Sequence, residues 1–397
     1  MMHRLVSALA AVALLTFPLP NAGAADALPP LKIGVMFSFS GDNARAGEGL
    51  NFGIATFQKE HGDTVAGRKV ELIRRDTGQM SPDTAKRIAQ ELIINDHVDL
   101  IMGIAYSPEA VAVGLVSTEA KMPVFIVNST TINIMKDAPY MSRYGMTSGQ
   151  LTSPLALYAY THNMKNIYTL ESDYQTGIDA GESFTKAFTA LGGKITGDVR
   201  PPLFAKDFTP YIQRVKDANP KPDGVFAFIP SGSGPAQFMR TWKEMGLDAK
   251  GITLIGEGGL VGEDDLLAIG DAAQGLITSF HYSAIHPSAL NERFVKDYLA
   301  VSGQGIRPDY AAVAGYDTLA AIYKVVELQK GKVDPDRTMA LLRGMTLDSP
   351  RGPIMIDPKT RDIDQNIYIR RTERKGGRMV NTELETYKMV KDPLENY

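Results

Sequence analysis

The chain has 397 residues, of which 42 are Lys or Arg and 45 are Asp or Glu, and its formal net charge is −3. Such a length suggests two or three domains, each large enough to bury its own core. The near-neutral charge argues against a nucleic-acid-binding protein, because such proteins carry a strongly basic surface. The absence of cysteine excludes disulfides, thiolate metal sites and Cys nucleophiles together.

The N-terminus has the pattern of a secretory signal peptide. Residues 1–4 are short and basic, residues 5–19 form an apolar run, and Ala22 and Ala24 supply the small residues of a cleavage site. The apolar run is too short to cross a bilayer, which argues against a transmembrane anchor. We therefore predict that residues 1–25 are a signal peptide, that no lipid anchor follows because Cys is absent, and that the mature protein is periplasmic.

Strands and amphipathic helices then alternate with short connections, as in parallel α/β domains. In a first series we expect strands at residues 31–39, 69–75, 98–103 and 123–127. The helices between them are expected at residues 47–60, 81–95 and 107–121. Right-handed crossovers and short loops make this series a doubly wound sheet.

A second series of the same kind begins near residue 150. Its expected strands are residues 166–170, 194–199, 224–229, 251–255 and 275–280. Its expected helices are residues 176–191, 208–218 and 234–245. Gly- and Pro-rich turns separate these elements.

The remaining segment lacks this alternation. Helices are expected at residues 287–302, 308–329 and 334–345 without strands between them, and residues 351–397 read as strands and turns. Helices without a sheet of their own must cover a sheet already built. We therefore predict an α/β protein of two doubly wound parallel-sheet lobes, joined by a multi-strand hinge with a cleft between them. Lobe 1 would comprise residues 26–147 with 281–350, and lobe 2 residues 148–280 with 351–397.

A binding site for a small anion is expected where strands of the first lobe end, since open parallel sheets bind ligands there. Ser107 is predicted to cap a helix that has Pro108 at its first position. Its hydroxyl, the free N–H groups of the first helical turn and the positive end of the helix dipole would together suit a carboxylate. The alternative is that Ser107 only caps its own helix. Ser129 and Thr131, in the loop after the next strand, would add two hydroxyls at the same place.

Aromatic residues occupy the same strand ends. Phe39 and Tyr106 belong to the first lobe, and Tyr174 follows the corresponding strand of the second. They could sandwich an apolar or aromatic ligand when the lobes close, or they could simply pack between loops.

Signals for catalysis are weak. Gly47, Gly49 and Gly53, with Asp76, imitate a dinucleotide fingerprint and leave an exported nucleotide-dependent oxidoreductase as an alternative. These glycines lie beyond the strand end, however, whereas the fingerprint requires them in the immediate turn. The six His residues are dispersed and fit no metal motif. We expect no catalytic residues, no metal and no cofactor.

Several segments resemble the periplasmic solute-binding proteins of branched-chain amino-acid ABC transporters. They include Ile33-Gly34-Val35 with Ser40-Gly41, Gly67-Arg68-Lys69-Val70, Val98-Asp99-Leu100-Ile101, Tyr174-Gln175-Thr176-Gly177, Lys206-Asp207-Phe208 and Gly270-Asp271-Ala272-Ala273. The resemblance covers essentially the whole mature chain. It implies the type I periplasmic binding protein fold, capture of a ligand by lobe closure and delivery to ABC permease subunits in the inner membrane. The protein would act as a monomer without nucleic acid, and a ligand-sensing role in a signalling system stays open.

The resemblance also implies where the ligand is held. The family binds an amino acid's carboxylate through loops of the Ser107 and Ser129–Thr131 type, and its ammonium through an acidic residue of lobe 2. Here that acidic position falls on Gly258 rather than on Glu257, and the bulky aromatic position falls on the small loop containing Ser231. The segment around Tyr282 is more similar to the branch that takes up aromatic acids. A benzoate derivative or another small carboxylate is therefore the expected ligand, with branched-chain amino acids as the alternative.

Overall fold

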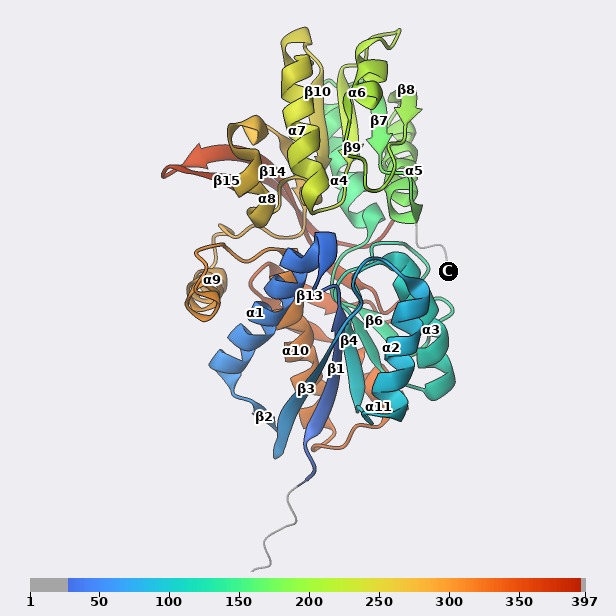
Figure 1. The fold of residues 1–397 in the computed structure, drawn as a ribbon, viewed down its shortest axis with the longest axis vertical. Helices are drawn as coiled ribbons and strands as arrows, with labels where there is room; N and C mark the ends of the chain where they lie inside the picture. The colour runs from blue at the N-terminus through green and yellow to red at the C-terminus, as the bar shows by residue number, and fades with distance from the viewer. Residues whose placement is uncertain (1–27, 394–397) are drawn as a thin grey trace, which may run out of the picture.

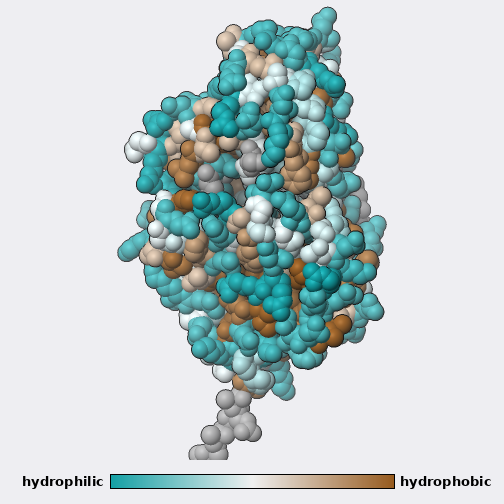
Figure 2. All heavy atoms as spheres, viewed as in Figure 1, coloured by the Kyte–Doolittle hydropathy of each residue, from teal (hydrophilic) through white to brown (hydrophobic). Residues whose placement is uncertain are grey.

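The computed structural model describes residues 28–393, so the predicted signal peptide, residues 1–25, lies outside the described residues. The chain forms two lobes, one above the other in Figure 1, each built on its own β-sheet. Within residues 28–393, no helix combines the length and the hydrophobicity that a membrane span requires. Hydrophilic residues cover most of the visible face of both lobes, and hydrophobic residues lie in small scattered groups (Figure 2).

The sheet of lobe 1 has six strands in the order β2-β3-β1-β4-β5-β6. Adjacent strands of this sheet are parallel, except for β2 and β3, which are antiparallel. In the register of the sheet, Ile33 of β1 lies opposite both Leu72 and Leu100. The strands are β1 (Leu31–Phe37), β2 (Thr64–Val65), β3 (Arg68–Asp76), β4 (Leu100–Gly103), β5 (Val124–Ile126) and β6 (Met141–Arg143). The helices of this series are α1 (Ala44–His61), α2 (Pro82–Ile94) and α3 (Ser107–Ala120). All three predicted helices occur, and β6 was not predicted.

The second sheet has nine strands in the order β12-β13-β14-β11-β10-β9-β7-β8, with β15 paired to β14. Its parallel part is β7 (Asn166–Glu171), β8 (Lys194–Val199), β9 (Gly224–Phe228), β10 (Thr253–Glu257) and β11 (Ile277–Phe280). Its antiparallel part is β12 (Thr346–Ser349), β13 (Gly352–Ile356), β14 (Ile363–Lys375) and β15 (Arg378–Val390). Its helices are α4 (Ser148–Thr161), α5 (Gln175–Ala190), α6 (Thr209–Lys216), α7 (Ser233–Met245) and α8 (Glu263–Ile269), of which α4 and α8 were not predicted.

The helices after β11 return to lobe 1. They are α9 (Ala289–Ser302), α10 (Tyr310–Leu328) and α11 (Pro335–Leu342), and both α9 and α10 pack against α1. Gly53 of α1 permits the closest approach, because a Cβ at that position would collide with the carbonyl oxygen of Ala312 in α10. The core they share with the first sheet extends to Ile354 and Ile367 of β13 and β14, so the C-terminal sheet reaches across the junction of the lobes.

The chain crosses between the lobes at β6–α4, after β11 and along β13–β14. Arg351, which is fully buried, ties two of these crossings together by donating hydrogen bonds to the carbonyl oxygens of Tyr144 and Gly145. Its guanidinium also forms an ion pair with Asp317 of α10, at 2.8 Å. A buried charge needs such a partner, so these contacts fix the geometry of the hinge.

Candidate ligand-binding site

A cavity lies between the lobes at the carboxyl ends of both parallel sheets. Its volume, taken as the space that the centres of water molecules can occupy, is about 80 Å³, which is enough for roughly five to eight waters. That is room for one small organic molecule rather than a peptide. Its polar lining residues are Asn43, Tyr106, Ser107, Asn128, Ser129, Thr130, Tyr174, Thr176, Ser231, Glu257 and Tyr310, and its apolar ones include Ala105, Met146, Phe228, Ile229, Pro230 and Phe280.

Ser107 lies at the centre of the lobe 1 wall. The helix begins at Ser107 itself and its N-cap is Tyr106, so the prediction that Ser107 caps the helix was wrong by one residue. The Ser107 oxygen instead accepts hydrogen bonds from the N–H of Thr131 and from the hydroxyl of Thr176, each at 3.2 Å. A serine hydroxyl has two acceptor positions and one proton. Both acceptor positions are therefore used, and the proton is left for an acceptor in the cavity.

Ser129 presents a second hydroxyl to the cavity. Its Oγ is buried and has no hydrogen-bond partner among the described residues. Its backbone is left-handed, with φ 73°, a conformation that costs energy for a residue with a side chain. A buried hydroxyl without a partner is unfavourable, so a ligand that accepts a hydrogen bond here relieves that cost.

Three long helices point their N-termini at this cavity. Asn43 is the N-cap of α1, Tyr106 that of α3 and Tyr174 that of α5, and all three line the cavity. None of these caps forms a side-chain hydrogen bond to its helix. A 3-10 turn, Gly41–Asn43, runs directly into α1, and the N–H of Ala44 is bonded to the carbonyl oxygen of Gly41. The free N–H groups at the cavity are therefore those of α3 and α5, and the positive ends of these two dipoles favour a negatively charged group.

Lobe 2 contributes a cluster of apolar residues to the cavity wall. Phe228, Ile229, Pro230 and Phe280 face the cavity, and the half-buried Tyr106 and Tyr174 lie at its edge. Arg370 of β14 packs against Phe280, with its guanidinium carbon 4.8 Å from the ring centroid. Such flat apolar surfaces suit an aromatic ring.

Arg370 is a buried cation that interacts electrostatically with the carboxylates of Asp309, Glu263 and Glu383. It donates hydrogen bonds to the carbonyl oxygens of Tyr282 and Gly258 and to the hydroxyl of Thr278. Burial lowers the pKa of Arg370 to about 10, so it stays charged at neutral pH. Its guanidinium lies against Phe280, which lines the cavity, and the three carboxylates offset its charge there.

Glu257, at the end of β10, is the acidic side chain that lines the cavity. It is 4% exposed, and its Oε1 has no hydrogen-bond partner among residues 28–393. Burial raises the pKa of the Glu257 carboxyl to about 8. The protonated form therefore predominates at neutral pH.

Gly258, the position at which the resemblance implies an acidic residue, has no room for one. A Cβ there would collide with the Phe280 ring and with the guanidinium of Arg370. The carbonyl of Gly258 instead accepts a hydrogen bond from Arg370.

The structure brings together six of the nine residues that the sequence singled out. They are Tyr106, Ser107, Ser129, Tyr174, Ser231 and Glu257, all of which line the cavity. The other three do not line it. Phe39 packs against Phe37, with ring centroids 6.3 Å apart, and the hydroxyl of Tyr282 donates to Asn291 in the core of lobe 1. Thr131 acts through its N–H, which orients Ser107, and Thr130 next to it lines the cavity instead.

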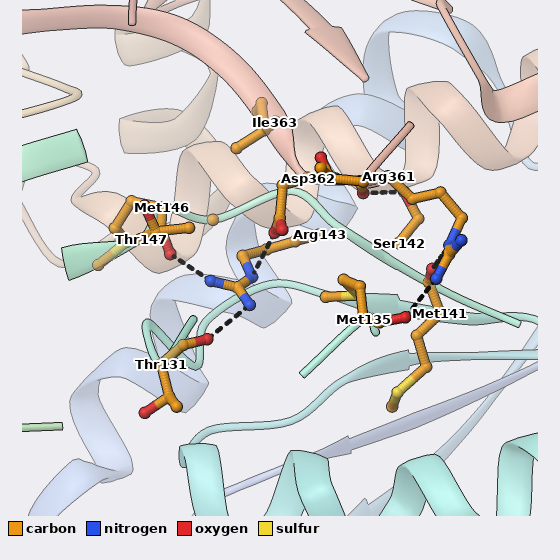
Figure 3. Close-up of polar contacts among 12 residues, drawn as sticks. Thr131, Met135, Met141, Ser142, Arg143, Met146, Thr147, Arg361, Asp362 and Ile363 are labelled. Carbon is orange, nitrogen blue, oxygen red and sulfur yellow. Dashed lines mark hydrogen bonds and ion pairs between the residues drawn. The ribbon is translucent and has the colours of Figure 1, made fainter. Parts of the chain in front are cut away.

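Figure 3 shows how the Thr131 loop is held in place. Arg143, at the end of β6, is fully buried, donates to the carbonyl oxygen of Thr131 at 2.8 Å and forms a 3.0 Å ion pair with Asp362. The N–H of Thr131 orients the Ser107 hydroxyl, so Arg143 and Asp362 help to fix the position of the anion site through this loop. Arg361 is anchored in the same region by the carbonyl oxygens of Met135 and Met141.

The glycines that imitate a dinucleotide fingerprint do not lie where a nucleotide-binding enzyme requires them. Gly47, Gly49 and Gly53 lie inside α1 rather than in the turn after β1. Gly47 packs on the backbone of Ser38, and Gly53 packs on α10. Among the described residues, no group of three or more His, Asp or Glu side chains is arranged to hold a metal ion.

Comparison with known proteins identifies the family. A family model described as "Periplasmic binding protein" matches residues 30–378. The chain is 36% identical over 364 residues to the Leu/Ile/Val-binding protein homolog 6 of Brucella melitensis, covering 91% of this chain and 93% of that protein. The chain therefore belongs to the periplasmic binding protein family, whose members bind solutes and are not enzymes.

Solved structures agree in fold and in kind of protein. A solute-binding protein of an ABC transporter from Rhodopseudomonas palustris BisB5, in complex with 3,4-dihydroxybenzoic acid, is 41% identical, with TM-score 0.87 and coverage of 92% of this chain and 99% of that one. A second, from R. palustris HaA2 in complex with p-hydroxybenzoic acid, is 37% identical, with TM-score 0.88 and coverage of 91% and 98%. The predicted type I periplasmic binding protein fold is thereby confirmed, and so is the similarity to the branch that binds aromatic acids.

Proposed function

We propose that this protein is the solute-binding subunit of an ABC importer and that it captures small aromatic carboxylates, the hydroxybenzoates in particular. The observation that carries the proposal is the division of the cavity between the lobes. Lobe 1 supplies the free proton of Ser107, the hydroxyl of Ser129 and helix N-termini, all of which suit a carboxylate. Lobe 2 supplies the apolar surfaces of Phe228 and Phe280, which suit an aromatic ring.

The electrostatics favour an anion over a zwitterion. An amino acid brings an ammonium group, which needs a carboxylate beside it when it is buried. Gly258 leaves no room for an acidic side chain, and the pKa of Glu257 is raised to about 8, so that its protonated form predominates at neutral pH. A benzoate has no ammonium group and needs no such partner.

Branched-chain amino acids are the second candidate. Two relatives favour them by name: the 36% identical Leu/Ile/Val-binding homolog of Brucella melitensis, and a binding protein for leucine, isoleucine, valine, threonine and alanine from Pseudomonas aeruginosa, 27% identical over 213 residues. Glu257 would then have to ionise against its burial to hold the ammonium group.

The remaining parts of the proposal concern the cell. Residues 1–25 act as a signal peptide, and the mature monomer works in the periplasm with ABC permease subunits of the inner membrane; a ligand-sensing role is the alternative.

Residues 26–147 with 281–350 form one lobe and residues 148–280 with 351–397 the other. Capture occurs by closure of the lobes, which a ligand favours only through contacts that it makes with both.

A thermal-shift screen followed by titration calorimetry tests the proposal. The set includes benzoate, the hydroxybenzoates, phenylpropanoids, leucine, isoleucine and valine. The proposal predicts that hydroxybenzoates raise the melting temperature most and bind most tightly, because tighter binding to the folded state gives greater stabilisation. Tight binding of leucine with no response to any aromatic acid would overturn it.

A further inference from the structure

Glu257 is a buried polar group that the carboxylate site does not use. It projects from the end of β10, beside the apolar residues Phe228 and Phe280 of the lobe 2 wall. Its Oε1 is buried without a hydrogen-bond partner, and no cationic side chain among the described residues forms an ion pair with it. The side chain therefore lines the ligand cavity with its hydrogen-bonding capacity unused.

The occupant of the cavity has to satisfy this group. An apolar ligand edge placed against Glu257 would leave the carboxyl without a partner and away from water, which is unfavourable. The other polar side chains of lobe 2 at the cavity are already engaged: Ser231 donates to the carbonyl of Gly259, Thr176 donates to Ser107, and Tyr174 shares a side-chain hydrogen bond with Thr176. Glu257 is thus the group of lobe 2 that is available to a polar substituent of the ligand.

A hydroxyl group matches Glu257 better than an ammonium group does. A protonated carboxyl both donates and accepts hydrogen bonds, and so does a hydroxyl. An ammonium group only donates, and holding it requires an ionised carboxylate inside an apolar wall.

We propose that Glu257 is the specificity-determining residue that recognises a hydroxyl group on the aromatic ring of the bound acid. This inference rests on the proposed function, because it takes the carboxylate to be held by lobe 1. A hydroxybenzoate then has its carboxylate on lobe 1 and its hydroxyl on lobe 2. Such a ligand favours the closed state more than benzoate does, because benzoate lacks the second polar contact.

The test is titration calorimetry of benzoate, the three monohydroxybenzoates and leucine, with the wild type, Glu257→Leu and Glu257→Gln. Glu244→Gln, on an exposed position of α7 outside the cavity, is the matched control. We expect the wild type and the control to bind the best hydroxybenzoate about tenfold more tightly than benzoate. Glu257→Leu should lose this preference by binding benzoate as well as or better than the hydroxy acid. Glu257→Gln, which keeps a donor and an acceptor, should retain most of it.

The outcomes separate this inference from the proposed function. Equal binding of benzoate and hydroxybenzoates by the wild type, or an unchanged preference in Glu257→Leu, overturns the role of Glu257 and leaves aromatic-acid binding in place. Binding of leucine alone, lost in Glu257→Gln, overturns both. If Glu257→Leu does not fold, the ratio of affinities in Glu257→Gln decides, since a Gln variant that has no preference for the hydroxyl contradicts the inference.

Discussion

The burial of Glu257 predicts that the ligand-free protein loses stability as pH rises, and that Glu257→Gln removes part of this loss. The carboxyl pKa is raised from 4.5 to about 8 in the folded protein. Between these values the folded state keeps a proton that the unfolded state has released, so unfolding becomes more favourable as pH increases. The Glu257 contribution is therefore fully present below pH 4.5 and is lost progressively up to pH 8.

The size of the effect follows from the shift. Each unit of separation between pH and the unfolded pKa corresponds to about 1.4 kcal/mol. At pH 7 the loss from Glu257 amounts to at most about 3 kcal/mol. Glutamine has nearly the same shape and cannot ionise, so Glu257→Gln should gain stability over the wild type by up to this amount at pH 7 and by little at pH 4.5.

The assay is urea unfolding of ligand-free protein between pH 4.5 and pH 8, with the wild type, Glu257→Gln and the exposed control Glu244→Gln. The midpoint difference between Glu257→Gln and the wild type should grow with pH, while the control should track the wild type. A difference that stays constant over this range would show that Glu257 does not hold a proton in the folded state.

Three further predictions follow from the site and the hinge. Ser107→Ala and Ser129→Ala should each weaken benzoate binding about tenfold to a hundredfold by calorimetry, since each removes a hydrogen bond to a charged group; unchanged affinity would remove the anion site. Gly258→Asp should lower the melting temperature without creating leucine binding, because the ring and guanidinium packed against Gly258 leave no space. Arg143→Ala should cost about 3–5 kcal/mol of unfolding free energy by leaving Asp362 buried and unpaired, and a loss below about 1 kcal/mol would contradict that pairing.

The alternation of strands and helices was sufficient to predict the fold because parallel sheets follow strong local patterns. The strands at residues 31–39 and 98–103 and the helix at residues 107–121 appear with boundaries shifted by a few residues. Helix α4 was missed because it begins directly after the hinge and contains Pro154, which normally argues against a helix interior. Helix α8 was missed because it has only seven residues and so shows little periodicity.

The sequence was sufficient to predict the part of the candidate site that lies in consecutive loops. Ser107 and Ser129 follow neighbouring strands, and the carboxyl ends of such strands meet at one edge of the sheet. Contacts between lobes leave no such signal in a single sequence. Thr176 donates to Ser107 across the cleft, and Asn43 and Tyr310 come from helices of distant segments.

The protonation of Glu257 and the burial of Arg370 could not be predicted either, because both depend on the three-dimensional fold. Arg370 lies 112 residues from the Gly258 carbonyl to which it donates. The sequence indicates only that the position at which an acidic residue is expected is a glycine, Gly258. The structure adds the reason, since Phe280 and Arg370 fill the space that such a side chain would need.

A crystal structure of the complex with 4-hydroxybenzoate would show directly which lobe holds the carboxylate. We expect closed lobes, with the carboxylate oxygens within hydrogen-bond distance of the hydroxyls of Ser107 and Ser129 at the N-terminus of α3. We further expect the ring to lie against Phe280 and the hydroxyl to point toward Glu257. A carboxylate bound to lobe 2, with Ser107 and Ser129 making no contact with the ligand, would rule out the proposed carboxylate site.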